Sequence, residues 1–209
     1  MPAPDAAAVL FDVDGTLVDA VANQRRIWAT WADRFRLDGD EVYSVALRTR
    51  PVETAAHFLP EADRARAVEH FHRLEDDDVH QGQYKAFTGV HQLLRDLEPD
   101  RWALVTANLR RRVEGRFRRL ALPVPRVIVD AESTVHGKPH PAPYLAAAAA
   151  LGVVPARCLV VEDSASGVAA GLAAGMTVWT VNGPVPLRGA HRHFPALSDA
   201  APDVLRFVG

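Results

Sequence analysis

The sequence predicts an α/β fold, in which a doubly wound parallel sheet forms the core and an α-helical domain is inserted after the first strand. From residue 88 onward, helix-like and strand-like segments alternate, as they do in the βα units of parallel sheets. The strand-like segments are almost entirely apolar, which is typical of strands buried on both faces. Residues 21–84, by contrast, contain helix-like patterns but no convincing strand. With 209 residues, the chain can hold one large domain with a modest insertion.

The first strand is predicted within residues 9–18, where a short apolar run ends in Asp12 and Asp14 and then in Gly15 and Thr16. If the strand continues, the two aspartates share one face and converge on one centre. Two close carboxylates need a cation or a shared proton between them. The alternative is an Asp-rich turn that closes the strand, because Asp and Gly are ordinary turn residues.

The inserted segment begins with an amphipathic helix over residues 23–35, where Trp28, Trp31, Ala32 and Phe35 recur at helical spacing. Further helix-like pieces cover residues 52–58 and 61–74. The acidic run of residues 75–78 is expected to be a solvated helix end and linker. A metal site is not expected there, because consecutive carboxylates cannot all face one ion.

The alternating part of the chain predicts helices over residues 89–97, 110–120, 144–151 and 166–174, and strands over residues 102–105, 126–129, 158–161 and 178–181. The third of these helices is marked by Pro141 near its first turn and by Gly152 just past its end. No element is predicted beyond residue 182. His191 and His193 lie in this tail, where we interpret them as exposed histidines rather than metal ligands.

Composition and charge favour a globular protein that stays in the cytoplasm. The formal net charge is −2, so no overall field attracts nucleic acid or anionic lipid. Residues 1–8 lack the basic flank and apolar length of a signal peptide, and no segment approaches the length of a membrane span. Cys158 is the single cysteine, so no internal disulfide can form, and its apolar surroundings indicate a packed side chain.

Arginines crowd residues 110–119 and interleave with Val113 and Phe117, with Leu120 following. We interpret this segment as an ordinary amphipathic helix that packs through its apolar residues. A nucleic-acid surface is not expected, because no aromatic stacking platform accompanies the arginines.

Four predicted strand ends carry polar side chains that suit chemistry. They provide Asp12 and Asp14, then Thr106 and Asn108, then Lys138 in the loop after the third strand, then Glu162 and Asp163. Each has a structural alternative, since Thr106, Asn108, Glu162 and Asp163 could cap helices and Lys138 could be a surface residue. Ligands of doubly wound sheets bind at the carboxyl ends of the strands. Together these residues predict a site for a hard divalent cation and a polyanion.

In this order and spacing, the segments Asp12-Val13-Asp14-Gly15-Thr16, Thr106, Gly137-Lys138-Pro139 and Glu162-Asp163-Ser164-x-x-Gly167 are similar to the motifs of one family. Over about residues 8–182, the chain resembles hydrolases of the haloacid dehalogenase superfamily that have a small helical cap. This resemblance implies a Rossmann-like core domain of residues 1–17 and 88–209, with a cap domain of residues 18–87.

The resemblance also implies a mechanism, in which Asp12 is the nucleophile that forms an aspartyl-phosphate and Asp14 is the general acid and base. Mg²⁺ would be held by Asp12, the backbone carbonyl of Asp14 and Asp163, with Glu162 as a further ligand or a support. Thr106 and Lys138 would donate to the phosphoryl oxygens. The implied substrate-binding residues are Thr106, Ala107, Asn108 and Lys138, to which we add Arg48 and Arg50 as a hypothesis.

By resemblance, the expected activity is that of a phosphatase acting on a small phosphorylated metabolite, most similar to sugar-phosphate and polyol-phosphate phosphatases. Asp14 argues against dehalogenases and phosphonatases, which lack the second aspartate. A β-phosphoglucomutase-like phosphomutase and a non-catalytic phosphate-binding protein are the alternatives. Where relatives tend to carry a His-Gly pair, this chain has residues 47–51, which include both cap arginines. We expect a monomer or weak homodimer, with neither nucleic acid nor membrane as partner.

Overall fold

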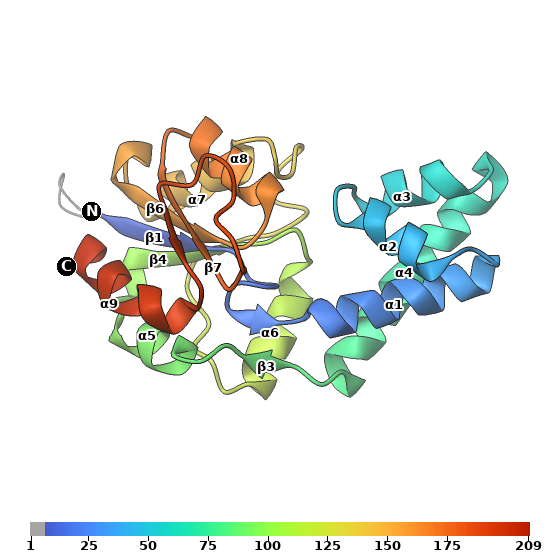
Figure 1. The fold of residues 1–209 in the computed structure, drawn as a ribbon, viewed down its shortest axis with the longest axis horizontal. Helices are drawn as coiled ribbons and strands as arrows, with labels where there is room; N and C mark the ends of the chain where they lie inside the picture. Colours follow the sequence, from blue (N-terminus) through green and yellow to red (C-terminus); the bar gives the residue numbers. More distant parts are fainter. Residues whose placement is uncertain (1–6) are drawn as a thin grey trace. The chain divides into compact units, whose positions relative to one another are not determined.

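The computed structural model describes residues 7–209, which form two compact units (Figure 1). The first unit joins the N-terminal segment up to Asp19 with Lys85–Gly209, and the second is Ala20–Tyr84. The sequence predicts the domain boundaries at 17/18 and 87/88. Strands β2 (Val18–Asp19) and β3 (Lys85–Ala86) pair antiparallel. The two chain segments that lead into and out of the second unit are therefore paired with each other within the first unit. Residues 1–6, on which part of the signal-peptide expectation rests, lie outside the described residues.

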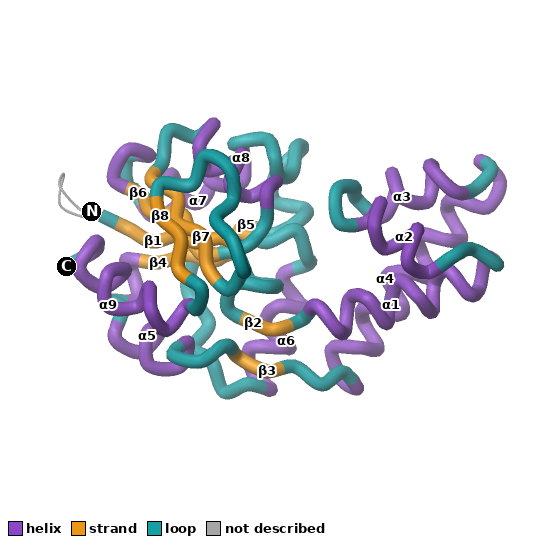
Figure 2. Tube along the Cα trace, viewed as in Figure 1, coloured by secondary structure: helices purple, strands orange, loops and turns teal. Residues whose placement is uncertain are grey.

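The first unit has an α/β architecture with a six-stranded sheet (Figure 2). Its strands are β1 (Ala8–Phe11), β4 (Trp102–Val105), β5 (Ile128–Val129), β6 (Cys158–Glu162), β7 (Thr177–Val181) and β8 (Arg192–Phe194). Its helices are α5 (Val90–Asp96), α6 (Arg110–Arg119), α7 (Ala142–Leu151), α8 (Ala165–Ala173) and α9 (Leu197–Val208), with short 3₁₀ turns at Pro99–Arg101 and Pro155–Arg157. The predicted α/β fold with a parallel sheet is therefore confirmed.

The sheet has the order β5-β4-β1-β6-β7-β8, and all five neighbouring pairs are parallel. β1 lies between β4 and β6, with later strands added outward on both sides. The order of the strands therefore changes direction at β1, and such a switch point opens a crevice at the carboxyl ends of the strands. The segment after β1 is placed at this crevice.

Helices cover both faces of the sheet, so the strands are apolar on both sides. Alternate residues of the strands, such as Leu10 and Val160, share a buried cluster with residues of α7 and α8. On the opposite face, Trp179 of β7 packs edge-on against Phe207 of α9, with 6.0 Å between ring centroids. Figure 1 shows α7 and α8 on one side of the sheet and α5 and α9 on the other.

The tail beyond residue 182, for which the sequence predicts no element, contributes β8 and α9. Residues 192–194 extend the sheet as its edge strand, and α9 buries Leu197 and Val204. His191 is exposed, as expected, while His193 is half-buried and bonds to Thr180 across the β7–β8 pair. Short segments rich in Pro, Gly and His give weak local signals, so their structure follows from the sheet edge that they cover.

The second unit is helical and consists of α1 (Val21–Phe35), α2 (Gly39–Ala46), α3 (Pro51–Phe58) and α4 (Glu61–Gln81). The predicted helical face of α1 is confirmed, because Trp28 and Trp31 are buried in this unit's core. Trp28 stacks on Phe71 of α4 at 4.2 Å between ring centroids, and Trp31 Nε1 donates to the Ala67 carbonyl at 2.8 Å. No helix among the described residues has the length and hydrophobicity to cross a bilayer.

The prediction that residues 75–78 form a solvated helix end and linker is wrong. α4 continues to Gln81, and Glu75 and Asp78 are both buried, at 4% and 7% exposure. Asp78 accepts hydrogen bonds from Asn23, Arg26 and Tyr84. Residues three apart share one helix face, so two acids of the run turn inward while Asp77 stays exposed.

Candidate active site

The polar residues predicted at the strand ends gather at the carboxyl edge of the first unit's sheet. Asp12 directly follows β1, Thr106 follows β4, and Glu162 ends β6 with Asp163 after it. Lys138 reaches this edge from the loop between β5 and α7. Neighbouring parallel strands end side by side, which explains how residues far apart in the sequence meet here.

Lys138 connects the ends of β1 and β6 through a buried ion-pair network. Its Nζ donates to Asp12 Oδ1 at 2.6 Å, to Glu162 Oε1 at 2.6 Å and to the Val105 carbonyl at 2.9 Å. An ammonium group has three donors, so all three are used. Burial opposes the charge of Lys138, but Asp12 and Glu162 outweigh it and raise its pKa well above the ordinary value of 10.5. The alternative of a surface lysine is therefore wrong.

Glu162 is fully buried and accepts hydrogen bonds on both carboxylate oxygens. Oε1 accepts from Lys138 and from the Tyr144 hydroxyl, the latter at 2.9 Å. Oε2 accepts from the backbone N–H groups of Asp163 and Ser164 at 3.0 Å each, and from Ser164 Oγ at 2.8 Å. Burial opposes ionisation, but Lys138 and these hydrogen bonds lower the pKa of Glu162.

The fourth motif requires glycine at position 167, because the Glu162 carboxylate lies against the first turn of α8. A Cβ at this position would lie 1.6 Å from Glu162 Oε1. Ser164 is the N-cap of α8 and accepts from the Gly167 N–H at 3.1 Å. The cap is therefore Ser164, and neither Glu162 nor Asp163 takes that role.

Asp163 lies against the loop after β1. Its Oδ1 accepts from Thr16 Oγ1 at 3.0 Å, and a Cβ at Gly15 would lie 2.0 Å from its Oδ2. Gly15 has a φ of +99°, which also favours glycine. Burial, followed by repulsion from Glu162, raises the pKa of Asp163 to about 7.

Asp12, Glu162 and Asp163 form an acidic cluster, in which one oxygen atom of each lies within 4.8 Å of the others. Burial raises the pKa of Asp12, Lys138 opposes that rise, and Glu162 and Asp163 add to it. Oxygen ligands of this kind suit Mg²⁺, and a bound cation would offset the repulsion among them. Because the Glu162 oxygens already accept five hydrogen bonds, the donor set favours Asp12 and Asp163 as the ligands and Glu162 as their support.

The expectation that Asp12 and Asp14 share a strand face is wrong, because β1 ends at Phe11. The chain then turns, with backbone N–H groups of residues 16–18 donating to the Val13 carbonyl. The carboxylate of Asp14 pairs with Arg116 of α6, whose Nη1 lies 2.7 Å from Oδ1 and 2.9 Å from Oδ2. The two aspartates therefore have different cationic partners.

The segment after β4 forms a short polar turn beside Asp14. Thr106 is buried, and its hydroxyl oxygen accepts from the Asn108 N–H at 3.0 Å. Asn108 Oδ1 accepts from the Leu109 N–H at 2.8 Å, and Asn108 Nδ2 lies 3.5 Å from Asp14 Oδ2. Ala107 lies between them and offers its backbone only. The N-cap of α6 is Leu109, so neither predicted polar residue occupies the cap position.

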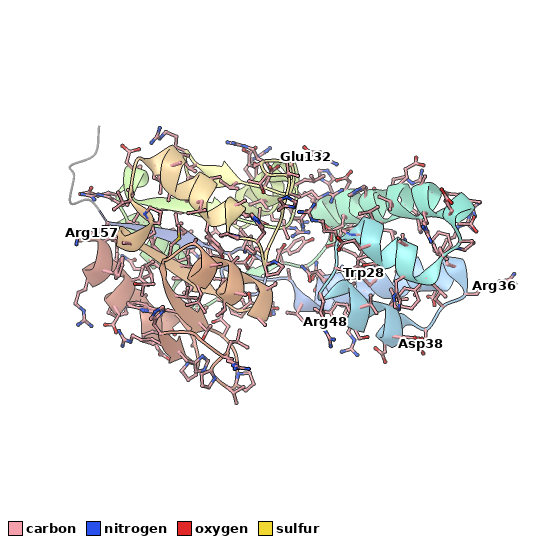
Figure 3. The ribbon with its side chains drawn as sticks, turned by 90° about the horizontal axis from the view of Figure 1, so that it is seen from above. Trp28, Arg36, Asp38, Arg48, Glu132 and Arg157 are labelled. Carbon is pink, nitrogen blue, oxygen red and sulfur yellow. The ribbon has the colours of Figure 1, made fainter. Side chains whose placement is uncertain are left out.

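Arg48 and Arg50 belong to the helical unit, in the connection between α2 and α3, and both are exposed. Figure 3 labels Arg48 in this connection. Arg50 is the N-cap of α3, and its N–H donates to Glu53 Oε2 at 2.9 Å. A substrate contact from either arginine stays a prediction. Unchanged kcat/KM in R48A and R50A across a substrate panel would contradict it.

Three residues of this region are not among the sequence-predicted site residues. Tyr144 places its ring 5.1 Å from Lys138 Nζ in addition to its bond to Glu162. Asn182 donates to the Gly15 and Thr16 carbonyls at 2.9 Å each. Arg116 holds Asp14. The signal for Arg116 is its spacing: Arg112 and Arg116 lie one turn apart beside Val113 and Phe117, which places both arginines on the buried face.

The match to known proteins agrees with this geometry. The family described as haloacid dehalogenase-like hydrolase matches residues 6–175. Hexitol phosphatase A of Escherichia coli (strain K12) is 38% identical over 178 residues, which cover 84% of this chain and 82% of that protein. Glycerol-1-phosphate phosphohydrolase 2 of Saccharomyces cerevisiae is 30% identical over 187 residues, or 82% of this chain and 72% of that protein. The crystal structure of CbbY from Rhodobacter sphaeroides in complex with phosphate has a TM-score of 0.77 at 26% identity, covering 93% of this chain and 96% of that chain.

Proposed function

This chain belongs to the haloacid dehalogenase-like hydrolase family, and on that premise we propose that it hydrolyses a sugar or polyol phosphate through an aspartyl-phosphate intermediate with Mg²⁺. Its relatives make it a phosphoric monoester hydrolase. The observation that carries the proposed mechanism is the network in which Lys138 joins Asp12 to Glu162 beside Asp163. The name of the hexitol phosphatase, at 38% identity, supports the substrate class.

Asp12 is the proposed nucleophile. One of its carboxylate oxygens forms a bond to phosphorus while the bond from phosphorus to the leaving oxygen breaks. The electron pair of the broken bond stays on the leaving oxygen. Asp12 and Asp163 would hold Mg²⁺ together with the backbone carbonyl of Asp14. A bound Mg²⁺ supplies positive charge that offsets repulsion between the carboxylate and the phosphate.

Lys138 and Thr106 would bind the phosphoryl oxygens. In the structure one donor of Lys138 bonds to Asp12, and we propose that this donor passes to a phosphoryl oxygen while Glu162 keeps the ammonium in place. The Thr106 hydroxyl accepts from the Asn108 N–H, so its own proton is free to be donated to phosphate. The backbone N–H of Ala107 and the side-chain amide of Asn108 lie on the same turn and would complete the phosphate site.

Asp14 is the proposed general acid and base. Its proton goes to the leaving oxygen in the first half-reaction. In the second, its carboxylate takes a proton from the water that attacks phosphorus, and the bond between phosphorus and the Asp12 oxygen breaks. The atoms of water therefore end on phosphate and on the released alcohol, and both aspartates return to their starting state.

The test is phosphate release from a panel of sugar, polyol and nucleotide monophosphates, with and without Mg²⁺. Asp12→Asn is expected to lower kcat by at least about 10⁴-fold, because loss of a nucleophile removes the covalent route. Asp19→Asn, at an exposed aspartate of the same segment, is the matched control and should retain activity. Undiminished release by Asp12→Asn would overturn the mechanism. Conversion of a sugar phosphate to its isomer without phosphate release would show a phosphomutase, and binding without turnover a phosphate-binding protein.

A further inference from the structure

Arg116 is a fully buried cation to which the proposed reaction assigns no role. It lies on α6, 102 positions from Asp14 in the sequence, with 1% of its side chain exposed. One of its nitrogens, Nη1, donates to both oxygens of the Asp14 carboxylate at 2.7 and 2.9 Å. The Asp14 side chain itself is only 11% exposed.

A buried guanidinium is costly unless it is paired, because burial removes its hydration. An apolar residue would serve α6 equally well at this buried position if packing were the sole requirement. Instead, Val113 and Phe117 supply the apolar contacts of the helix, and Arg116 beside them extends to the site. The contact with Asp14 is short and charge-assisted, which makes it the strong kind of hydrogen bond.

The position of the Asp14 carboxylate depends on this contact more than on its other neighbour. Asn108 Nδ2 lies 3.5 Å from Asp14 Oδ2, at the outer limit of a hydrogen bond. The other carboxylates of the site have partners of their own: Asp12 is held by Lys138, and Asp163 by Thr16. Arg116 therefore does for Asp14 what Lys138 does for Asp12.

We propose that Arg116 is a positioning residue, which holds the Asp14 carboxyl where it reaches the leaving oxygen and the attacking water. This inference rests on the proposed function, because it assigns Arg116 a task in that reaction. Arg116 neither gives nor takes a proton, since a guanidinium stays charged in proteins. We assign its effect to this contact with Asp14, which moves the proton in both half-reactions.

The test uses the leaving group. A para-nitrophenolate ion leaves readily without a proton, whereas the alkoxide of a hexitol needs one, so general-acid help matters far more for a hexitol phosphate than for para-nitrophenyl phosphate. The parameter to compare is kcat/KM, which covers the steps up to leaving-group release and is not limited by hydrolysis of the aspartyl-phosphate. Arg116→Met should lower kcat/KM about 10- to 100-fold for the hexitol phosphate and less than about threefold for para-nitrophenyl phosphate.

Three further variants separate positioning from a merely structural role. Arg116→Lys should recover part of the lost activity on the hexitol phosphate, because it restores the charge without the full reach. In an Asp14→Asn background, Arg116→Met should change kcat/KM less than about threefold, because its route of action is already gone. Arg118→Met removes an exposed arginine of the same helix and should leave both substrates unaffected.

Equal losses on both substrates would overturn the proposal, because a general disturbance of the site does not distinguish leaving groups. If Arg116→Met does not fold, the same ratio measured for Arg116→Lys decides: an unchanged ratio relative to wild type overturns the proposal, and a selective loss on the hexitol phosphate supports it. Failure of the proposed function is recognised separately, because the wild-type protein would then hydrolyse neither compound. In that case both proposals fall together.

Discussion

At the scale of single residues, the acidic side chains of this site are held by partners that differ in kind. Glu162 is enclosed by hydrogen-bond donors and Lys138, Asp163 accepts from Thr16, and Asp14 pairs with Arg116. Glu162 therefore has a low pKa, whereas Asp163, with fewer donors, has a pKa of about 7. The difference supports our proposal that Glu162 is a structural charge and that Asp163 binds the cation.

Replacing Gly167 by alanine tests the support that Glu162 provides. The added Cβ would overlap the Glu162 carboxylate, so Glu162 must move and its hold on Lys138 is lost. We expect unfolding in urea to show a loss of about 1–3 kcal/mol, as for other overpacked positions. The kcat should fall by about 10²-fold, because Lys138, which we propose binds the phosphoryl group, is misplaced.

The matched control is Gly39→Ala, in the first turn of α2. A Cβ there would lie 3.4 Å from the Ala29 Cα, close to an ordinary contact. Its effect on kcat should be less than about twofold, since misplacement of catalytic groups is the costly kind of change. If Gly167→Ala keeps full activity, the buried glutamate does not position the lysine.

At the scale of elements, α4 and α6 show that the buried face of a helix can include charged residues as well as apolar ones. In α6 the buried positions hold Arg112 and Arg116 beside Val113 and Phe117. The interpretation that α6 packs through its apolar residues is confirmed for Val113 and Phe117, but the packing face also includes these two arginines. In α4 the last turns bury two acids instead, Glu75 and Asp78. Both helices bury charge where a partner from another segment receives it.

Replacing Asp78 by alanine tests the element-level role of the acidic run. The change leaves Asn23, Arg26 and Tyr84 without the carboxylate that they share. Asn23 is itself buried, so the expected loss of unfolding free energy is about 1–3 kcal/mol, measured by urea denaturation. Asp77→Ala removes the exposed neighbour from the same helix and should change stability by less than about 0.5 kcal/mol.

The stability that Asp78 contributes, measured as the difference in unfolding free energy between wild type and Asp78→Ala, depends on pH with a definite sign. Burial opposes the charge of Asp78, but hydrogen bonds from Tyr84, Asn23 and Arg26 outweigh it and lower its pKa below the ordinary value of 3.8. Because the folded protein binds the proton more weakly than the unfolded chain, the stabilisation is fully present above the unfolded pKa. It is lost as the pH falls through the lower pKa of the folded state.

Equal losses of unfolding free energy for Asp77→Ala and Asp78→Ala would show that the hydrogen-bond network around Asp78 contributes nothing.

At the scale of the whole molecule, the strand order assembles the site. β1 lies between β4 and β6, so the ends of these three strands bring Asp12, Thr106 and Glu162 together. Lys138 comes from the loop after β5, the strand beyond β4. A cation bound among the carboxylates would therefore bridge segments that are distant in the sequence.

Mg²⁺ is consequently expected to stabilise the folded protein. A ligand that binds the folded state alone, at a hundredfold excess over its Kd, adds about 2.7 kcal/mol to the unfolding free energy. Thermal unfolding monitored by tryptophan fluorescence should therefore shift upward with MgCl₂ in wild type. In Asp163→Asn, which lacks a proposed ligand, the shift should be lost.

KCl of equal ionic strength is the control for general salt effects. Without Mg²⁺, Asp163→Asn should be no less stable than wild type, because burial and repulsion from Glu162, which raise the pKa of Asp163 to about 7, no longer oppose a charge at this position. An equal upward shift in the variant would place the cation elsewhere. No shift in wild type at millimolar MgCl₂ would contradict a magnesium site in the free protein.

Much of the fold is predictable because its signals are local. The runs that form β1 and β4 are apolar throughout, and β6 is apolar up to Glu162. The motif residues lie at the ends of these strands or in the turns directly after them. The edge of the sheet at β8 is harder to predict from the sequence. β8 is only three residues long, and its pairing depends on β7. Short edge strands have weak patterns, since one face or end of them lacks a packing partner.

The sequence by itself determined the α/β alternation, the helical insertion and the candidate residues Asp12, Lys138 and Asp163, because strand periodicity and motif spacing are properties of neighbouring residues. Only the tertiary structure decided the partner of each charge. Asp12 meets Lys138 across 126 positions, and Asp14 meets Arg116 across 102. A buried charge requires a partner nearby in space, and periodicity carries no information about which distant segment supplies it.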